Sequence, residues 1–197
     1  MPFAYPVLLE LSGKRAVVIG SFALAERKDV SLRKAGAEVD VFANGAWSPE
    51  DLDGAFVCVA SSEDPAERDA VARAARERGV LVNVMDDIPN CDFAAPAVVR
   101  RGDLVIAIAT GGRSPTLARK ARELIEVAFG PEWEGAFEVI AELREQTLTT
   151  IPDMRERANR WYDALDIDEV ADLARDGRLD EVRERLASRL GVREVRA

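Results

Sequence analysis

The sequence Arg-Ala-Val-Val-Ile-Gly, at residues 15–20, is a short apolar run that ends in a glycine. Such a run is typical of a buried parallel strand just before its turn. Residues 23–35 then gather helix formers and stop at Gly36, and residues 38–42 give a second strand pattern. Strand, helix and strand within about thirty residues predict one βαβ unit.

The same alternation continues along the next part of the chain. Strand patterns occupy residues 55–60, 80–84 and 104–109, and residues 66–78 form a helical pattern between the first two. The fold class predicted from this alternation is α/β, with a Rossmann-like, doubly wound parallel sheet. Ligands of such sheets bind beyond the carboxyl ends of the strands. The residues expected at that edge are Gly20, Ser61, Asp86 and Thr110.

After Pro115 the pattern is entirely helical. Helices are expected over five stretches, which are residues 117–129, 133–147, 151–161, 168–175 and 179–190. The last of these is amphipathic, with Val182, Leu186 and Leu190 on one face. The sequence therefore predicts a sheet domain followed by a helical one.

Composition excludes several classes of function. The 197 residues carry a formal net charge of -9, so a general nucleic-acid partner is not expected. The sequence has no histidine, which rules out a histidine zinc site, a Ser-His-Asp triad and an imidazole base. Cys58 lies in an apolar run and is predicted to be a core residue. No apolar stretch approaches the roughly 18 residues of a membrane span, so no membrane partner is expected and the predicted location is the cytoplasm.

The turn after the first strand partly matches a dinucleotide-binding fingerprint. Gly20 and the final small residue, Ala25, fit the pattern, but Phe22 stands where a second glycine would let the backbone approach a pyrophosphate. The N-terminus of the following helix still offers free N–H groups to an anion. The acid expected on the adenosine ribose at the end of the second strand is missing. Because the first glycine and the helix N-terminus fit, NAD is the candidate cofactor, with Asn44 as the only substitute for the missing acid. The residues predicted to bind it are Gly20, Ser21, Phe22, Ala23 and Asn44.

Two adjacent carboxylates follow the strand pattern at residues 80–84. Asp86 is the candidate for acid–base chemistry, since a carboxylate at a strand end can accept a proton or bind a metal ion through oxygen. Asp87 is predicted to be structural, because aspartate is common at the start of a turn.

Residues 110–115, Thr-Gly-Gly-Arg-Ser-Pro, are predicted to bind carboxylates. Gly111 and Gly112 can present bare N–H groups, and Arg113 and Arg119 add positive charge. The alternative is that Ser114 and the proline after it merely begin a helix.

Together these motifs resemble the siroheme synthase N-terminal family, which contains precorrin-2 dehydrogenases that are often also sirohydrochlorin ferrochelatases. The matching stretches are residues 8–28, 34–39, 79–87, 91–97 and 110–119. The resemblance implies a nucleotide-binding domain over residues 1–113, a dimerisation region over 114–150 and a helical C-terminal domain over 151–197. It also implies a homodimer.

The resemblance further implies NAD-dependent oxidation of precorrin-2 to sirohydrochlorin, with iron as a possible second substrate. The family's key aspartate falls on Asp86, as the catalytic or metal-handling residue. The tetrapyrrole would be held by Asn83, Thr110, Gly111, Gly112, Arg113, Ser114 and Arg119.

The chain departs from the family at two places that both concern NAD. Gly20-Ser21-Phe22 replaces a run of three glycines, and a short link at residues 43–54 replaces a longer region with an extra strand. The alternatives to a dehydrogenase are therefore a redox-inactive chelatase or a tetrapyrrole-binding partner that has lost NAD.

Overall fold

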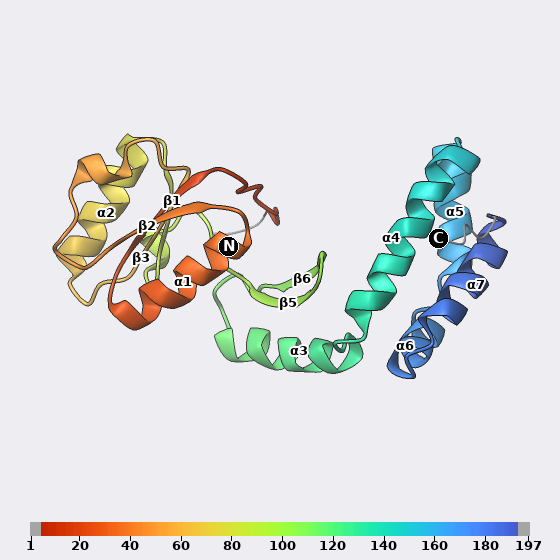
Figure 1. Cartoon of the computed structure of the whole chain (residues 1–197). Coiled ribbons are helices and arrows are strands. Elements are labelled where there is room, and N and C mark those ends of the chain that lie inside the picture. Colours follow the sequence, from red (N-terminus) through yellow and green to blue (C-terminus); the bar gives the residue numbers. More distant parts are fainter. Residues whose placement is uncertain (1–4, 193–197) are drawn as a thin grey trace. The chain divides into compact units, whose positions relative to one another are not determined.

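The computed structural model describes residues 5–192, except for the side chains of residues 22–25. The described residues divide into two compact units, which are coloured along the chain in Figure 1. The first unit runs to residue 95 and takes in residues 111–114 again, and the second holds residues 96–110 and those from 115 onward. Each unit has its own core and is described by itself.

A parallel sheet forms the centre of the first unit. Its strands are β1 (Arg15–Ile19), β2 (Glu38–Phe42), β3 (Val57–Ala60) and β4 (Leu81–Val84), in the spatial order β2-β1-β3-β4. A dinucleotide-binding sheet places a further strand outside the second one. Here β2 is followed only by the short 3-10 helix η1 (Pro49–Leu52) before the chain enters β3. The expected short link and Rossmann-like fold are both confirmed.

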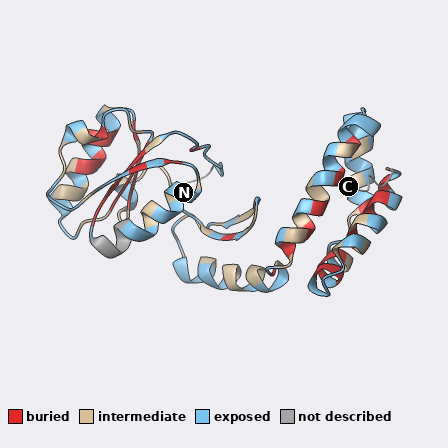
Figure 2. Ribbon diagram, viewed as in Figure 1, coloured by how far each residue is buried: buried red, intermediate tan, exposed pale blue. Residues whose placement is uncertain are grey.

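Two helices cover opposite faces of this sheet. Apolar residues of α2 (Pro65–Glu77) pack with Val17 and Ile19 on one face, whereas Ala16 and Val18 face the end of α1 (Phe22–Lys34). The alternation follows from the two-residue period of a strand, whose side chains point to both faces in turn. Figure 2 shows the resulting buried strands. Cys58 is fully buried among them, as predicted, and burial raises the pKa of its thiol to about 12.

The prediction of a fifth parallel strand at residues 104–109 was wrong. The strand β6 (Leu104–Ile108) pairs in antiparallel fashion with β5 (Ala97–Arg101), in a separate sheet of the second unit. Only Gly102 and Asp103 connect the strands, and Gly102 has a φ of 55°. A two-residue link makes a hairpin, whereas parallel strands need a crossover of a dozen or more residues. The strand on which the predicted place of Thr110 depended is therefore not part of the parallel sheet.

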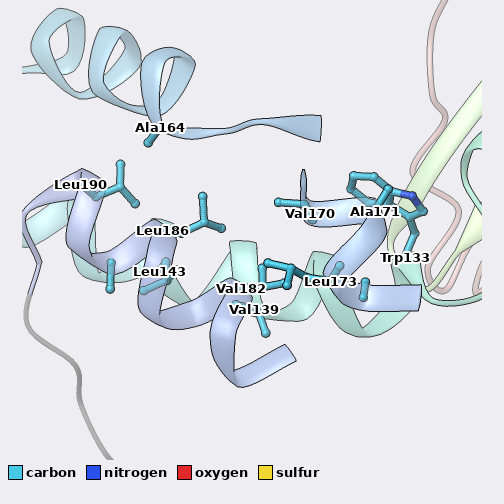
Figure 3. Close-up of a cluster of buried hydrophobic side chains, with 13 residues drawn as sticks. Trp133, Val139, Leu143, Ala164, Val170, Ala171, Leu173, Val182, Leu186 and Leu190 are labelled. Atoms are coloured by element: carbon cyan, nitrogen blue, oxygen red, sulfur yellow. The ribbon is translucent and has the colours of Figure 1, made fainter. Parts of the chain in front are cut away.

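Helices form the rest of the second unit. They are α3 (Pro115–Ala128), α4 (Trp133–Thr150), α5 (Met154–Ala164), α6 (Ile167–Arg175) and α7 (Leu179–Leu190). Figure 3 shows the core that α4 to α7 share, where Trp133, Leu143 and Leu186 are almost completely buried. The predicted stripe of Val182, Leu186 and Leu190 lies in this core. Within residues 5–192, no helix has the length and apolar character needed to cross a membrane.

Candidate functional site

Turns that follow three neighbouring strands meet at one edge of the sheet. The Gly20 N–H donates to Phe42 O at 3.0 Å, the Ser61 N–H to Ile19 O at 2.9 Å, and the Met85 N–H to Ala60 O at 2.8 Å. These bonds extend the hydrogen-bond ladder of the sheet one residue beyond the strands, so the first residue of each turn is bonded to a neighbouring strand. Gly20, Ser61 and the turn that contains Asp86 therefore lie at the carboxyl edge, as predicted.

The N-terminus of α1 opens at this edge. Ser21 precedes the helix in an extended conformation, and its side chain makes no capping hydrogen bond. The N-terminus of a helix attracts anions through its first-turn N–H groups and its dipole, and the Ser21 side chain does not occupy these groups here. The side chains of Phe22 and Ala23 lie outside the described residues, and their binding of NAD stays a prediction. Asn44 is exposed in the turn after β2.

Asn83 has a structural partner in the fold. Its side chain is buried in β4, and its amide donates to Phe93 O at 2.8 Å and to Cys91 Sγ at 3.6 Å. A buried amide without such partners would be costly, so these bonds explain an asparagine within an apolar strand. The binding of substrate by Asn83 stays a prediction.

The outer edge of β4 is closed by Asp92 instead of a further strand. The Asp92 N–H donates to Val82 O at 2.7 Å, and the Val82 N–H donates to Asp92 Oδ2 at 3.2 Å. Arg76 of α2 donates to the other carboxylate oxygen at 3.0 Å. The segment that returns after the Asp86 turn is thus fixed to both the strand and the helix.

Asp86 has an unusual backbone conformation. Its φ is 60°, and no other non-glycine residue among residues 5–192 has a positive φ. This left-handed conformation costs an L residue roughly 1 kcal/mol or more, and aspartate tolerates it better than most. The side chain is exposed and makes no hydrogen bond or ion pair within the described part of the chain. Its carboxylate is therefore available to a ligand.

Asp87 is held firmly beside it. Its carboxylate accepts from Asn90 Nδ2 at 3.1 Å and pairs with Arg68 Nε at 2.9 Å. The Asn90 hydrogen bond, followed by the Arg68 contact, lowers the pKa of Asp87, although partial burial acts in the opposite direction. This arrangement agrees with the predicted structural role. Sequence reasoning missed Arg68, because its partner lies 19 residues further along the chain and no local pattern connects them.

The loop at residues 111–114 belongs to the same unit as the Asp86 turn. Gly112 has a φ of 76°, and a Cβ atom there would lie 2.9 Å from Ile88 Cδ1. The left-handed backbone conformation favours glycine at this position, and the contact shows that the loop lies against the Ile88 side chain. Gly112 therefore lies against the segment that follows Asp86, and Gly111, Arg113 and Ser114 belong to the same unit.

The other two predicted substrate residues, Thr110 and Arg119, belong to the second unit. Arg119 is exposed on α3, where its Nε lies 3.8 Å from Glu123 Oε1. Within residues 5–192 no group of three or more His, Cys, Asp or Glu side chains could hold a metal ion. A metal-handling role for Asp86 stays a prediction.

Comparisons with known proteins agree with this geometry. The family described as "Putative NAD(P)-binding" matches residues 7–97. Siroheme synthase 1 of Pectobacterium atrosepticum is 31% identical over 94% of the chain, and siroheme synthase of Methylococcus capsulatus is 33% identical over 89%. The chain spans 42% and 41% of the length of these relatives. The solved structure of SirC, a precorrin-2 dehydrogenase, has a TM-score of 0.71 at 20% identity, over 94% of this chain and 100% of that one.

The parallel sheet makes the first unit a Rossmann-like domain, and the family match over residues 7–97 makes it one of the NAD(P)-binding type. The chain as a whole belongs to the siroheme synthase N-terminal family, as its motifs indicate.

We predict that Asp87→Asn destabilises the protein at neutral pH by about 1–2 kcal/mol, since it removes a charge-assisted pair with Arg68. A carboxyl whose pKa is lower in the folded state stabilises that state above its ordinary value of 3.8. The difference from the wild type should therefore shrink as the pH falls below that value. Denaturant unfolding at a series of pH values measures it, with exposed Asp103→Asn as control. A difference that persists unchanged in acid would contradict the ionised pair.

Proposed function

We propose that the chain catalyses the NAD-dependent oxidation of precorrin-2 to sirohydrochlorin. The observation that carries the proposal is the exposed, unpaired carboxylate of Asp86, held on a left-handed turn at the same sheet edge as the uncapped N-terminus of α1. One group can take a proton there while the other can bind the pyrophosphate of a dinucleotide. The names of the relatives supply the substrate and the reaction for this proposal.

The residues at the edge fit NAD by their chemistry. The N–H groups at the start of α1, which the Ser21 side chain does not cap, would hold the pyrophosphate, and the turn after β2, with Asn44, would face the adenosine half. When bound, NAD supplies an acceptor for the hydride that leaves the macrocycle. With the cofactor at the ends of β1 and β2, the Asp86 turn remains for the tetrapyrrole, because it follows β4, two strands away from β1.

Oxidation of precorrin-2 removes a hydride and a proton, and Asp86 would accept the proton. Its carboxylate is exposed, so that a substrate can approach within the hydrogen-bonding distance that a general base requires. Gly112 and Arg113, next to the turn, would bind carboxylates of the substrate through N–H groups and positive charge. Local donors are needed because the net charge of -9 repels a polycarboxylate.

A redox-inactive chelatase is the second candidate. The observation that favours it is the absence of any strand between β2 and β3, together with Phe22 in the cofactor turn. In that case Asp86 would handle iron or a pyrrole proton, and NAD would have no effect. A dehydrogenase and a chelatase are separated by whether NADH forms.

We predict that the wild-type chain forms NADH from NAD and precorrin-2, and that Asp86→Asn lowers kcat by about 100-fold or more. Asparagine also tolerates the left-handed conformation, so the variant should keep its melting temperature. Initial rates of NADH absorbance measure the reaction, and the exposed Asp103→Asn serves as a charge-matched control. Full activity in Asp86→Asn would remove the residue from the mechanism. A wild-type chain that binds precorrin-2 without forming NADH would replace the dehydrogenase by the chelatase or the partner.

We further propose a homodimer formed through α3. The helix is amphipathic but contains no buried residue, and it exposes Leu117 by 60%, Leu124 by 73% and Val127 by 80%. The hairpin β5–β6 against which it packs is itself only marginally stable as an isolated pair of strands. A second copy would cover both and contribute the roughly 1,200–2,000 Å² that a stable interface needs.

The double variant Leu124→Glu, Val127→Glu should be monomeric at micromolar concentration, because it places charge on the apolar stripe. Analytical ultracentrifugation measures the change, and Leu148→Glu, on α4, is the control that should remain dimeric. A wild-type chain that sediments as a monomer at the same concentration would refute the dimer.

A further inference from the structure

The carboxylate of Glu67 occupies a position that the sequence left without an acid. It lies on the first turn of α2 and is half-buried. Its Oε1 accepts from the Gly45 N–H at 2.7 Å and from Trp47 Nε1 at 2.9 Å, and its Oε2 accepts from Ser62 Oγ at 2.6 Å. The turn that follows β2 and the turn that follows β3 are therefore joined through this one side chain.

Strand order places this carboxylate beyond the end of β1. Gly45 comes three residues after β2 ends at Phe42, and Ser62 comes two residues after β3 ends at Ala60. Because β1 lies between β2 and β3, a group that bridges their turns lies across the end of β1, where α1 begins. A dinucleotide whose pyrophosphate binds the start of α1 has its adenosine ribose in this region.

The carboxylate keeps one acceptor position for a ligand. Three donors occupy three of about four lone-pair sites, and the remaining site is on Oε2. Burial favours the neutral acid, but the Ser62, Gly45 and Trp47 hydrogen bonds together lower the pKa of Glu67, so that it is ionised at neutral pH. An ionised oxygen of this kind accepts a hydrogen bond from a hydroxyl and repels a phosphate.

The surrounding sequence carries no cation that could pair with a phosphate. Between Lys34 and Arg68 the chain has no lysine or arginine. Arg68 itself is engaged by Asp87 and by the carbonyl oxygens of Ser62 and Glu63. Proteins that bind NADP use an arginine to accommodate the 2′-phosphate, and this stretch offers none that is uncommitted.

We propose that Glu67 is the residue that selects NAD over NADP, by accepting a hydrogen bond from an adenosine ribose hydroxyl and repelling a 2′-phosphate. The role rests on the proposed NAD dependence and goes beyond it, because it replaces the acid missing from the end of β2 with one from α2. Trp47 and Gly45 fix the carboxylate, so that the shortened link after β2 serves to position it.

Calorimetric titration of the whole chain with NAD and NADP tests the assignment. The wild-type chain should bind NAD about 100-fold more tightly than NADP. Glu67→Gln keeps an acceptor oxygen for Gly45 and Trp47 but loses the charge, so the preference should fall below about tenfold, with weaker NAD and tighter NADP binding. Glu63→Gln removes an exposed charge four residues away and should leave the preference unchanged. Ser62→Ala removes one donor, keeps the carboxylate and should also retain the preference.

Each outcome bears on a separate claim. A wild-type chain that binds both dinucleotides equally well would overturn the role of Glu67 and leave the dehydrogenase proposal intact. Glu67→Gln that weakens both dinucleotides by the same factor would also overturn it, because that is the result of a purely structural acid. If the wild-type chain binds neither dinucleotide, NAD dependence itself fails and the role of Glu67 fails with it.

Discussion

The exchange of two hydrogen bonds between Asp92 and Val82 closes the outer edge of β4, and the rest of the candidate site depends on it. Asp92 uses its backbone N–H and its carboxylate to take the place of a neighbouring strand. An open edge would leave unpaired backbone groups and a mobile return segment. With the edge closed, and with Asn83 bonded to Phe93 O, the chain between them has fixed ends. That short span holds Asp86 in its left-handed conformation.

Because the ends of this span are fixed, the acids Asp86, Asp87 and Asp92 can have different roles. Asp87 and Asp92 form ion pairs with Arg68 and Arg76 of α2, and these pairs stabilise the turn. Asp86, in contrast, has no partner within the described residues. Backbone strain at one exposed residue is tolerated when its surroundings determine it, and such strain is common at functional sites. The site therefore combines a rigid frame with one accessible carboxylate. Glu67 repeats the arrangement at the turn after β2, where neutral donors fix the acid and leave part of it accessible.

Most of the first unit could be predicted from the sequence, because local patterns determine it. The strand at residues 38–42 has the predicted bounds, and the other parallel strands differ by one or two residues. In the second unit, the helix at residues 179–190 also has the predicted bounds. The strand β6 was assigned to the wrong sheet because an apolar run does not reveal its partner. The Gly102-Asp103 link was the signal for a hairpin. The pairing of Arg68 with Asp87 and the bonds of Glu67 depend on tertiary contacts between distant residues. Asp86 could be singled out by its position at a strand end, but its left-handed φ could not.

We propose that the closure of β4 by Asp92 positions Asp86 for proton transfer. The most direct measurement compares kcat for precorrin-2 oxidation between Asp92→Asn, which keeps an acceptor for the Val82 N–H, and Asp92→Ala, which does not. Asp92→Ala should lower kcat by about 10- to 100-fold, as expected for a displaced reactive group. The affinity for NAD should be unchanged, and Asp92→Asn should retain most of the rate. Equal, wild-type rates in both variants would contradict it.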